Sequence, residues 1–201
     1  MNFIQPTQQS TSEEELHKDR TAVFGFWVYL MTDFVLFASL FSVYVVLRAG
    51  QVLTPSATQI FSAPFVLTET LLLLTSSLIC GLVLLAARAG KKHNVLVGLG
   101  VTLLLGASFL GMELYEFGNL IREGHTYHLN GFLSSYFTLV GTHGFHIFVG
   151  LIWGMVLAVV INLQGLTRFT MRKLVLWSLF WHFLDIVWIF IFTIVYLTSF
   201  I

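Results

Sequence analysis

The stretch "WHFLDIVWIFIFTIVYLTSF", residues 181–200, is almost wholly apolar, yet it begins with two ionisable residues three positions apart, His182 and Asp185. A hydrocarbon core about 30 Å thick is crossed by about 20 helical residues, so this stretch is long enough to span a membrane. The whole chain agrees, since 57% of its 201 residues are hydrophobic and only 10% are charged, against about 25% charged in typical soluble domains. The composition therefore predicts a membrane protein, with a mean hydropathy of +0.86.

Outward from this stretch, the charged residues divide the chain into five long apolar intervals. The expected spans are residues 22–47, 65–87, 95–121, 132–163 and 174–200. Alternating segments of about ten residues, the signature of a transmembrane β-barrel, are not seen. The predicted fold class is thus an all-α membrane protein, a bundle of five transmembrane helices over residues 21–201 that follows a polar tail over residues 1–20.

The basic residues predict the orientation of this bundle. Cytoplasmic segments retain excess Lys and Arg, and most of these residues fall in the tail and in the second and fourth connections: Lys18, Arg20, Arg88, Lys91, Lys92, Arg168, Arg172 and Lys173. Only Arg48 and Arg122 lie on the other side. We expect a cytoplasmic N-terminus and a periplasmic C-terminus. The net charge is zero and no other basic cluster exists, so nucleic-acid binding is not expected.

Small and aromatic residues suggest how the helices pack. Glycine lets helix backbones approach closely where lipid gives no hydrophobic drive for association, and the candidates are Gly106, Gly111, Gly150 and Gly154, the last two forming a GxxxG. Aromatic residues near the expected span ends are interpreted as an aromatic belt at the membrane surfaces: Trp27, Trp177 and Trp181 on the cytoplasmic side, and Tyr44, Tyr127 and Tyr196 on the other.

Eight ionisable residues lie at membrane depth. A charge at the bilayer centre costs about 3 kcal/mol on insertion scales, so these side chains should avoid lipid. Residues three apart on a helix are neighbours, and three local pairs result. The candidates are Asp33 in the first span, Glu69 in the second, the pair Glu113 and Glu116 in the third, His143 and His146 in the fourth, and His182 and Asp185 in the fifth.

Three roles for these residues compete. Metal or haem ligation is suggested by "THGFH", residues 142–146, but HExxH spacing is absent and no cysteine pair accompanies a histidine. A proton relay through Asp33, Glu113 and the histidines is a second possibility, because intramembrane acids often serve that use. Interhelical hydrogen bonds that fix helix register are the third and favoured reading. Nucleophilic catalysis lacks a G-x-S-x-G elbow, so no catalytic and no metal-binding residue is assigned.

The amino-acid sequence of each span resembles the corresponding segment of a known family. "GFWVYLMTDFVLFASLF", "PFVLTETLLLLTSS", "GMELYEF", "GFLSSYFTLVGTHGFHIFVGLIW" and "SLFWHFLDIVWIFIFTIVYL" follow one another in the chain. In this order they resemble subunit III of the haem-copper respiratory oxidases, over essentially the whole chain after the first twenty residues. The compact five-span form looks most like the branch formed by the bacterial bo-type ubiquinol oxidases.

This resemblance implies a cofactor-free accessory subunit. The haems and copper of such complexes belong to a partner, subunit I. The implied roles are assembly, stability and support of proton uptake in subunit I, together with retention of membrane phospholipids, in a complex of the bacterial inner membrane that handles ubiquinol. Asp33 occupies the place of a buried glutamate in the mitochondrial motif, a shorter acid of equal charge. Six further residues match structural polar positions of the family: Glu113, Glu116, His143, His146, His182 and Asp185.

Two alternatives remain open at this point. Within the family, the chain could serve a cytochrome c oxidase or a menaquinol oxidase, because the electron donor is selected by other subunits. From another class, it could be a small proton-coupled transporter. The odd number of spans and the absence of proline-broken helices in corresponding halves count against a transporter with inverted repeats.

Overall fold

The computed structural model describes residues 6–49, 63–122 and 131–197, as helices and the tight turns between them. The helices are α1 (Pro6–Ala49), α2 (Ala63–Arg88), α3 (Lys92–Arg122), α4 (Gly131–Gln164) and α5 (Arg168–Ile191), and a short π-helix, η2 (Phe192–Tyr196), continues α5. In these residues, five helices are long and apolar enough to cross a membrane. The expected all-α class with five spans is confirmed. Helices suit this setting because each satisfies its own backbone hydrogen bonds where water is absent.

The helix that contains the fifth expected span begins before that span. The span was predicted from residue 174, and α5 starts at Arg168. Thr167 is the reason, since its hydroxyl accepts a hydrogen bond from the backbone N–H of Thr170 while the Thr170 side chain binds the Thr167 backbone, a reciprocal cap. Such a cap fixes the first turn of a helix. The polar residues that were assigned to a connection therefore form the start of α5.

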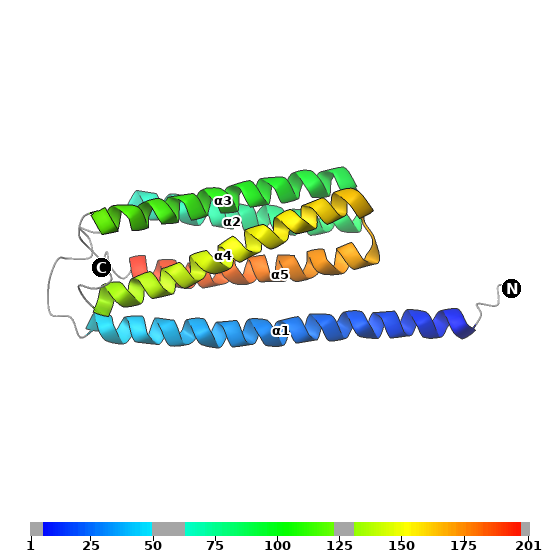
Figure 1. The fold of residues 1–201 in the computed structure, drawn as a ribbon, viewed down its shortest axis with the longest axis horizontal. Helices are drawn as coiled ribbons and strands as arrows, with labels where there is room; N and C mark the ends of the chain where they lie inside the picture. The colour runs from blue at the N-terminus through cyan, green and yellow to red at the C-terminus, as the bar shows by residue number, and fades with distance from the viewer. Residues whose placement is uncertain (1–5, 50–62, 123–130, 198–201) are drawn as a thin grey trace. The chain divides into compact units, whose positions relative to one another are not determined.

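The chain divides into two compact units, Met1–Leu36 and Phe37–Ile201. The first contains the start of α1. In the second, α2 packs on α3, α3 on α4, α4 on α5, and α5 again on α2, which closes a four-helix bundle; Figure 1 shows these helices side by side. The end of α1 joins this unit through ring contacts of Phe41 with Phe190 and of Tyr44 with Phe132.

Two tight turns connect neighbouring helices within the bundle. Gly90 lies between α2 and α3 with φ of 70°, and Gly165 follows α4 with φ of 74°. Positive φ favours glycine because it lacks the Cβ that would clash with the backbone. These turns keep α2 beside α3 and α4 beside α5 in antiparallel pairs.

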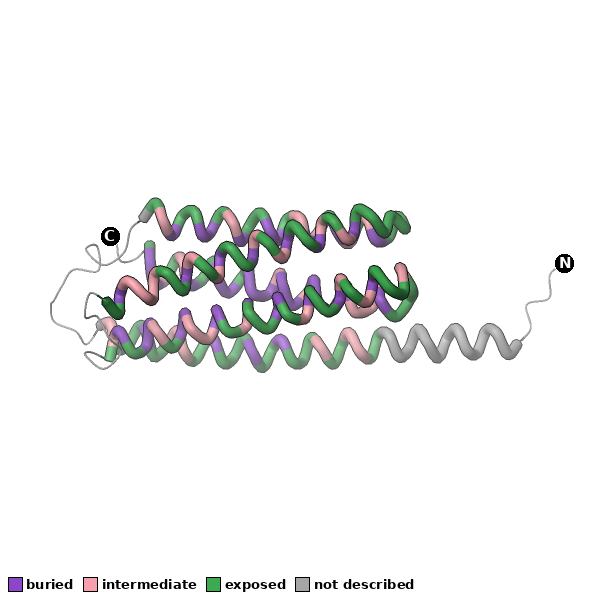
Figure 2. Tube along the Cα trace, turned by 45° about the horizontal axis from the view of Figure 1, so that its top comes forward, coloured by how far each residue is buried: buried purple, intermediate pink, exposed green. Residues whose placement is uncertain are grey.

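Buried residues recur along each helix of the bundle, as the purple segments in Figure 2 show. They are densest on α5, where 56% of the most apolar window is buried inside the chain, against 28% on α3. The fully buried large side chains of α5 are Trp177, Trp181 and Trp188. α5 is therefore the most buried helix of the bundle: it packs on α2 and α4, and its Trp181 and Trp188 side chains reach α3.

Candidate functional site

The ionisable residues of the bundle fall mainly into two groups. We call the first the carboxyl–tyrosine cluster (Glu69, Glu113, Glu116, Tyr136 and Tyr196). We call the second the α2–α5 polar clasp (Ser77, His182 and Asp185). Each group joins side chains from helices that are far apart in sequence, so both depend on the packing of the bundle.

The carboxyl–tyrosine cluster contains a hydrogen-bonded chain. The Tyr196 hydroxyl donates to Glu116 Oε2 at 3.1 Å, and the hydroxyl oxygens of Tyr136 and Tyr196 are 2.9 Å apart. Because Tyr196 uses its proton for the carboxyl group, Tyr136 is the donor in the tyrosine pair. Tyr196 is the last residue of η2, a π-helical turn of the kind that is frequent at functional sites. These two hydrogen bonds connect α3, α4 and η2.

The other two acids of the cluster are sealed within the protein. Glu69 is 0% and Glu113 2% exposed, and each lies within electrostatic range of other acids of the cluster. Among the described residues, both Glu69 carboxyl oxygens and Glu113 Oε2 lack a hydrogen-bond partner. Since the chain itself covers these groups, they cannot reach lipid or the surface of a partner subunit.

Gly144 of α4 leaves the space that the Glu113 carboxyl group occupies. A Cβ added to Gly144 would lie 2.6 Å from Glu113 Oε1, closer than real contacts allow. Sequence reasoning selected the histidines on both sides of Gly144 and missed the glycine between them. The available signal was a small residue next to a buried polar position in an otherwise bulky span.

The two histidines of α4 have different surroundings. His143 is 0% exposed; its ring stacks on Trp188 with centroids 5.4 Å apart and meets the edge of Phe109 at 6.0 Å. Among the described residues neither of its ring nitrogens has a hydrogen-bond partner. His146 is partly exposed, and its Nδ1 donates to the Thr142 carbonyl oxygen of the same helix at 2.7 Å. The contacts of His143 are thus those of an aromatic core residue.

The α2–α5 polar clasp is centred on Ser77. Its hydroxyl oxygen lies 2.7 Å from His182 Nδ1, and the Asp185 carboxyl group lies within electrostatic range of His182. The residue types are those of a Ser-His-Asp hydrolase, but the connectivity is different. In a hydrolase the acid hydrogen-bonds Nδ1 of the histidine, whereas here His182 Nδ1 is hydrogen-bonded to Ser77. The arrangement suits attachment of α5 to α2. No pattern in the sequence separates Ser77 from the other hydroxyl residues of the second span.

Replacing Ser77 with alanine should destabilise the bundle. The change leaves His182 Nδ1 without its partner, and an orphaned polar group inside a protein costs about 1–3 kcal/mol. The free energy of unfolding, measured in mixed detergent micelles, should fall by that amount. Ser108→Ala is the matched control, because the Ser108 hydroxyl is exposed and binds only the carbonyl of Leu104 on its own helix. Equal stability of the two variants would contradict the clasp.

The tryptophans of α5 hold polar contacts inside the bundle. Trp177 Nε1 donates to the Gly150 carbonyl at 2.9 Å, Trp181 Nε1 to Ser76 Oγ at 3.1 Å, and Trp188 Nε1 to Thr70 Oγ1 at 3.1 Å. Trp177 and Trp181 are 0% and 1% exposed, and Tyr44 and Tyr196 are both 0% exposed, so the interpretation of these four as belt residues is wrong. Tyr127 lies outside the described residues. Trp27, which is 46% exposed, stays compatible with a belt.

Three of the four selected glycines make room for side chains. A Cβ on Gly106 would lie 2.7 Å from the Trp181 ring, one on Gly150 3.1 Å from that ring, and one on Gly154 2.6 Å from Leu103. Gly111 differs, since a Cβ there meets no atom within 4 Å. The small residues thus accommodate the large rings of α5 as well as close helix approach.

Two further residues complete the account of the predicted positions. Asp33 belongs to the first unit, where the Tyr29 side chain hydrogen-bonds its carboxyl group. Cys80 is a free, buried thiol that donates to Ser178 Oγ at 3.4 Å. Across the described helices and turns, no group of three or more His, Cys, Asp or Glu could hold a metal ion.

The sequence is similar to those of known membrane proteins. The sequence matches the family described as cytochrome c oxidase subunit III over residues 10–200. Cytochrome bo(3) ubiquinol oxidase subunit 3 of Pseudomonas aeruginosa is 54% identical over 175 residues, which cover 87% of this chain and 84% of the relative. Cytochrome c oxidase subunit 3 of Bacillus sp. (strain PS3) is 43% identical over 173 residues, covering 86% and 84%. The probable quinol oxidase subunit 3 of Staphylococcus saprophyticus is 39% identical over 189 residues, covering 94% of each.

These matches agree with the five spans and confirm the resemblance found in the sequence. They cover the first unit from residue 10, the whole bundle, and both polar groups. The chain belongs to the cytochrome c oxidase subunit III family.

Proposed function

We propose that this chain is the accessory subunit III of a ubiquinol oxidase, a membrane complex that oxidises ubiquinol and reduces oxygen to water while pumping protons. The supporting observation is the identity of 54%, over 87% of this chain, with a bo(3) ubiquinol oxidase subunit 3. In this role the chain holds no haem or copper of its own. Those cofactors are carried by subunit I, its principal partner.

The structure supports a scaffolding role for the chain. Two pairs of its polar side chains form hydrogen bonds between its own helices: Tyr196 with Glu116, and His182 with Ser77. Large apolar side chains such as Phe145, Met155 and Val159 on α4 are 63%, 52% and 58% exposed. Such a surface suits lipid and apolar partner helices. We infer that the bundle supports assembly, stability and proton uptake of subunit I in the bacterial inner membrane.

The same proposal includes a topology. The N-terminal tail, residues 1–20, and the α2–α3 and α4–α5 turns lie in the cytoplasm, and the C-terminus lies in the periplasm. The support is the excess of Lys and Arg in those segments, together with the positive-inside rule. Labelling of single cysteines placed in these segments, with a reagent that cannot cross the membrane, tests the assignment.

A cytochrome c oxidase is the second candidate for the complex. The favouring observation is the identity of 43% with cytochrome c oxidase subunit 3 of Bacillus sp. (strain PS3). Oxygen consumption by the purified complex, supplied in turn with ubiquinol, menaquinol and reduced cytochrome c, separates the candidates. Activity with ubiquinol supports the proposal, and activity only with cytochrome c or menaquinol contradicts it. The relatives described above are all oxidase subunits, which gives no support to a transporter.

The accessory role predicts a specific defect when the polar clasp is broken. His182→Ala or Asp185→Ala should lower the yield of intact complex much more than the turnover per assembled haem, since the clasp joins α2 to α5 and touches no reacting group. Haem content per membrane protein and oxygen consumption per haem give the two quantities, with Ser108→Ala as the control. Normal yield with severely reduced turnover would instead favour a proton relay.

A further inference from the structure

The carboxyl–tyrosine cluster gathers three acids from two helices without a basic residue beside them. Glu69 belongs to α2, and Glu113 and Glu116 belong to α3. Glu113 lies within electrostatic range of both other acids, and Glu69 within range of Glu116. Among the described residues, the groups that act on these acids are carboxyl groups and a tyrosine hydroxyl, and none is basic. Three negative charges here would repel one another with no cation to offset them.

Glu116 differs from the other two acids because it accepts a hydrogen bond. The Tyr196 hydroxyl donates to its Oε2 at 3.1 Å, and Tyr136 lies behind Tyr196 with the two hydroxyl oxygens 2.9 Å apart. A hydroxyl that donates to a carboxylate stabilises the charge on it. Glu116 is therefore the member of the cluster that is best suited to be ionised.

Glu69 and Glu113 have no such support. They are 0% and 2% exposed, and both Glu69 oxygens and Glu113 Oε2 lack a hydrogen-bond partner among the described residues. Since neither Glu69 oxygen has a partner, the two carboxyl groups do not bind each other directly. Buried polar atoms are nearly always satisfied by protein groups or by ordered water. The unpartnered Glu69 carboxyl thus indicates a small polar ligand between α2 and α3.

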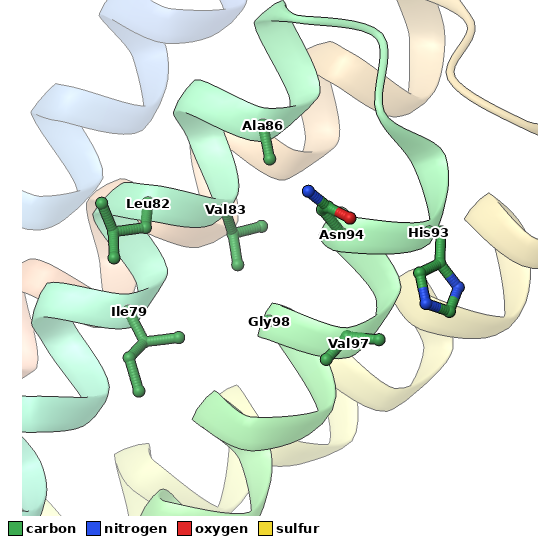
Figure 3. A pocket seen from close by; sticks show the side chains of 8 residues that line it. All are labelled: Ile79, Leu82, Val83, Ala86, His93, Asn94, Val97 and Gly98. Atoms are coloured by element: carbon green, nitrogen blue, oxygen red, sulfur yellow. The ribbon is translucent and has the colours of Figure 1, made fainter.

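The other end of the α2–α3 interface shows that these helices can pack without polar groups. A Cβ on Gly98 would lie 2.5 Å from a Val83 methyl group, and Figure 3 shows Val83 reaching from α2 toward α3 beside an apolar groove. Glu69 lies about 21 Å from this level along the α2 axis. There the helices are related through carboxyl groups instead of methyl groups, so hydrogen bonds must complete the interface.

We propose that Glu69 and Glu113 are neutral carboxylic acids that bind water enclosed between α2 and α3, while Glu116 alone carries a negative charge. Each neutral acid donates its hydroxyl proton to a water oxygen and accepts a hydrogen bond through its carbonyl oxygen. Buried water typically makes about three hydrogen bonds to otherwise unsatisfied groups. A single charge also leaves no pair of like charges in the cluster. The proposal does not rest on the proposed function of the complex.

A metal cation between ionised acids is the competing occupant. It would require negative charge on Glu69 and Glu113 as well as on Glu116. Within the described helices and turns, no group of three or more His, Cys, Asp or Glu could hold a metal ion. The geometry therefore favours water, which needs only hydrogen-bonding atoms.

The first test compares infrared spectra, at neutral pH, of the purified complex and of complexes that carry Glu69→Gln, Glu113→Gln or Glu116→Gln. Neutral carboxylic acids have a carbonyl stretch that is separate from the bands of carboxylates. Glu69→Gln and Glu113→Gln should each remove one neutral-acid band, and the matched control Glu116→Gln should remove none. Glutamine keeps the size of the side chain and still hydrogen-bonds water, so the bundle should fold.

The second measurement needs no variant. A high-resolution cryo-electron microscopy structure of the unmodified complex should show ordered solvent within hydrogen-bond distance of both Glu69 and Glu113. Loss of a neutral-acid band only in Glu116→Gln would overturn the proposal, as would spectra in which neither Glu69→Gln nor Glu113→Gln removes a band. A direct contact of Glu69 with another protein group, or a metal ion bound between the acids, would likewise overturn it.

Discussion

Trp181→Ala should lower the free energy of unfolding by about 3 kcal/mol. Trp181 is 1% exposed, stacks on Trp177 with ring centroids 5.3 Å apart, and donates a hydrogen bond to Ser76. Truncation of a buried aromatic residue costs about 3–5 kcal/mol in soluble proteins. In a membrane the transfer part of this cost is small because the surrounding lipid is apolar too, so we expect a value near the lower end.

Two further variants separate the causes of this loss. Ser76→Ala removes only the hydrogen-bond acceptor of the indole and should cost about 1–3 kcal/mol. Trp27→Ala removes a ring that is 46% exposed and should change the stability of the isolated chain little. Unfolding in mixed micelles, followed by tryptophan fluorescence and circular dichroism, provides the measurement. A loss for Trp27→Ala as large as that for Trp181→Ala would show that the core has been assigned to the wrong residues.

Gly106→Leu should disrupt the bundle, whereas Gly111→Leu should be tolerated. The added Cβ alone would lie 2.7 Å from the Trp181 ring at position 106, while at position 111 it meets nothing within 4 Å. Overpacking a core costs about 1–3 kcal/mol and occasionally more, and here the obstacle is a rigid ring packed between Gly106 and Gly150. Both changes place the same residue on the same helix, which makes them a matched pair.

The comparison is read from the amount of each variant in the membrane and from its melting temperature after extraction. Gly106→Leu should be depleted and should melt at lower temperature, with Gly111→Leu close to the unmodified chain. If both glycines tolerate leucine, the close contact between the Trp181 ring and Gly106 of α3 is incorrect. If both fail, the surface at Gly111 is covered by another subunit, and small residues there serve the complex.

The sequence was sufficient for the five spans because one physical rule governs them. Apolar runs of about 20 residues between charges must be helical in a bilayer, and the structure contains five such helices in the described residues. The helix that contains the fifth span begins before residue 174 because Thr167 caps its first turn, which starts at Arg168. Composition marks where charge occurs, whereas the helix boundary is set by local hydrogen bonds.

The sequence also identified the ionisable residues of the core but not most of their partners. Selecting Glu113 or His182 needs only the cost of a polar group at membrane depth. The contact of Glu113 with Gly144, and that of His182 with Ser77, depend on how each helix is rotated against its neighbour, and a single sequence does not encode that rotation in a simple period.

Tryptophan placement shows the same limit. Position near a span end suggested a belt for Trp177 and Trp181, yet both lie in the core, and glycines on α3 and α4 make the space for them. Tyr196 is a second case, because it reaches Glu116 from a π-helical turn. No sequence pattern distinguishes the glycines that make room for these rings, or the π-helix η2, from ordinary helix.

The most direct test of the central claim is purification of the tagged chain from membranes in mild detergent, with mass spectrometry of its partners and an optical spectrum before and after the chain is separated from them. The account predicts that a large haem-containing subunit and ubiquinol-dependent oxygen consumption copurify, and that the separated chain is colourless. A chain that purifies alone, or that keeps haem by itself, would contradict the assignment as an accessory subunit.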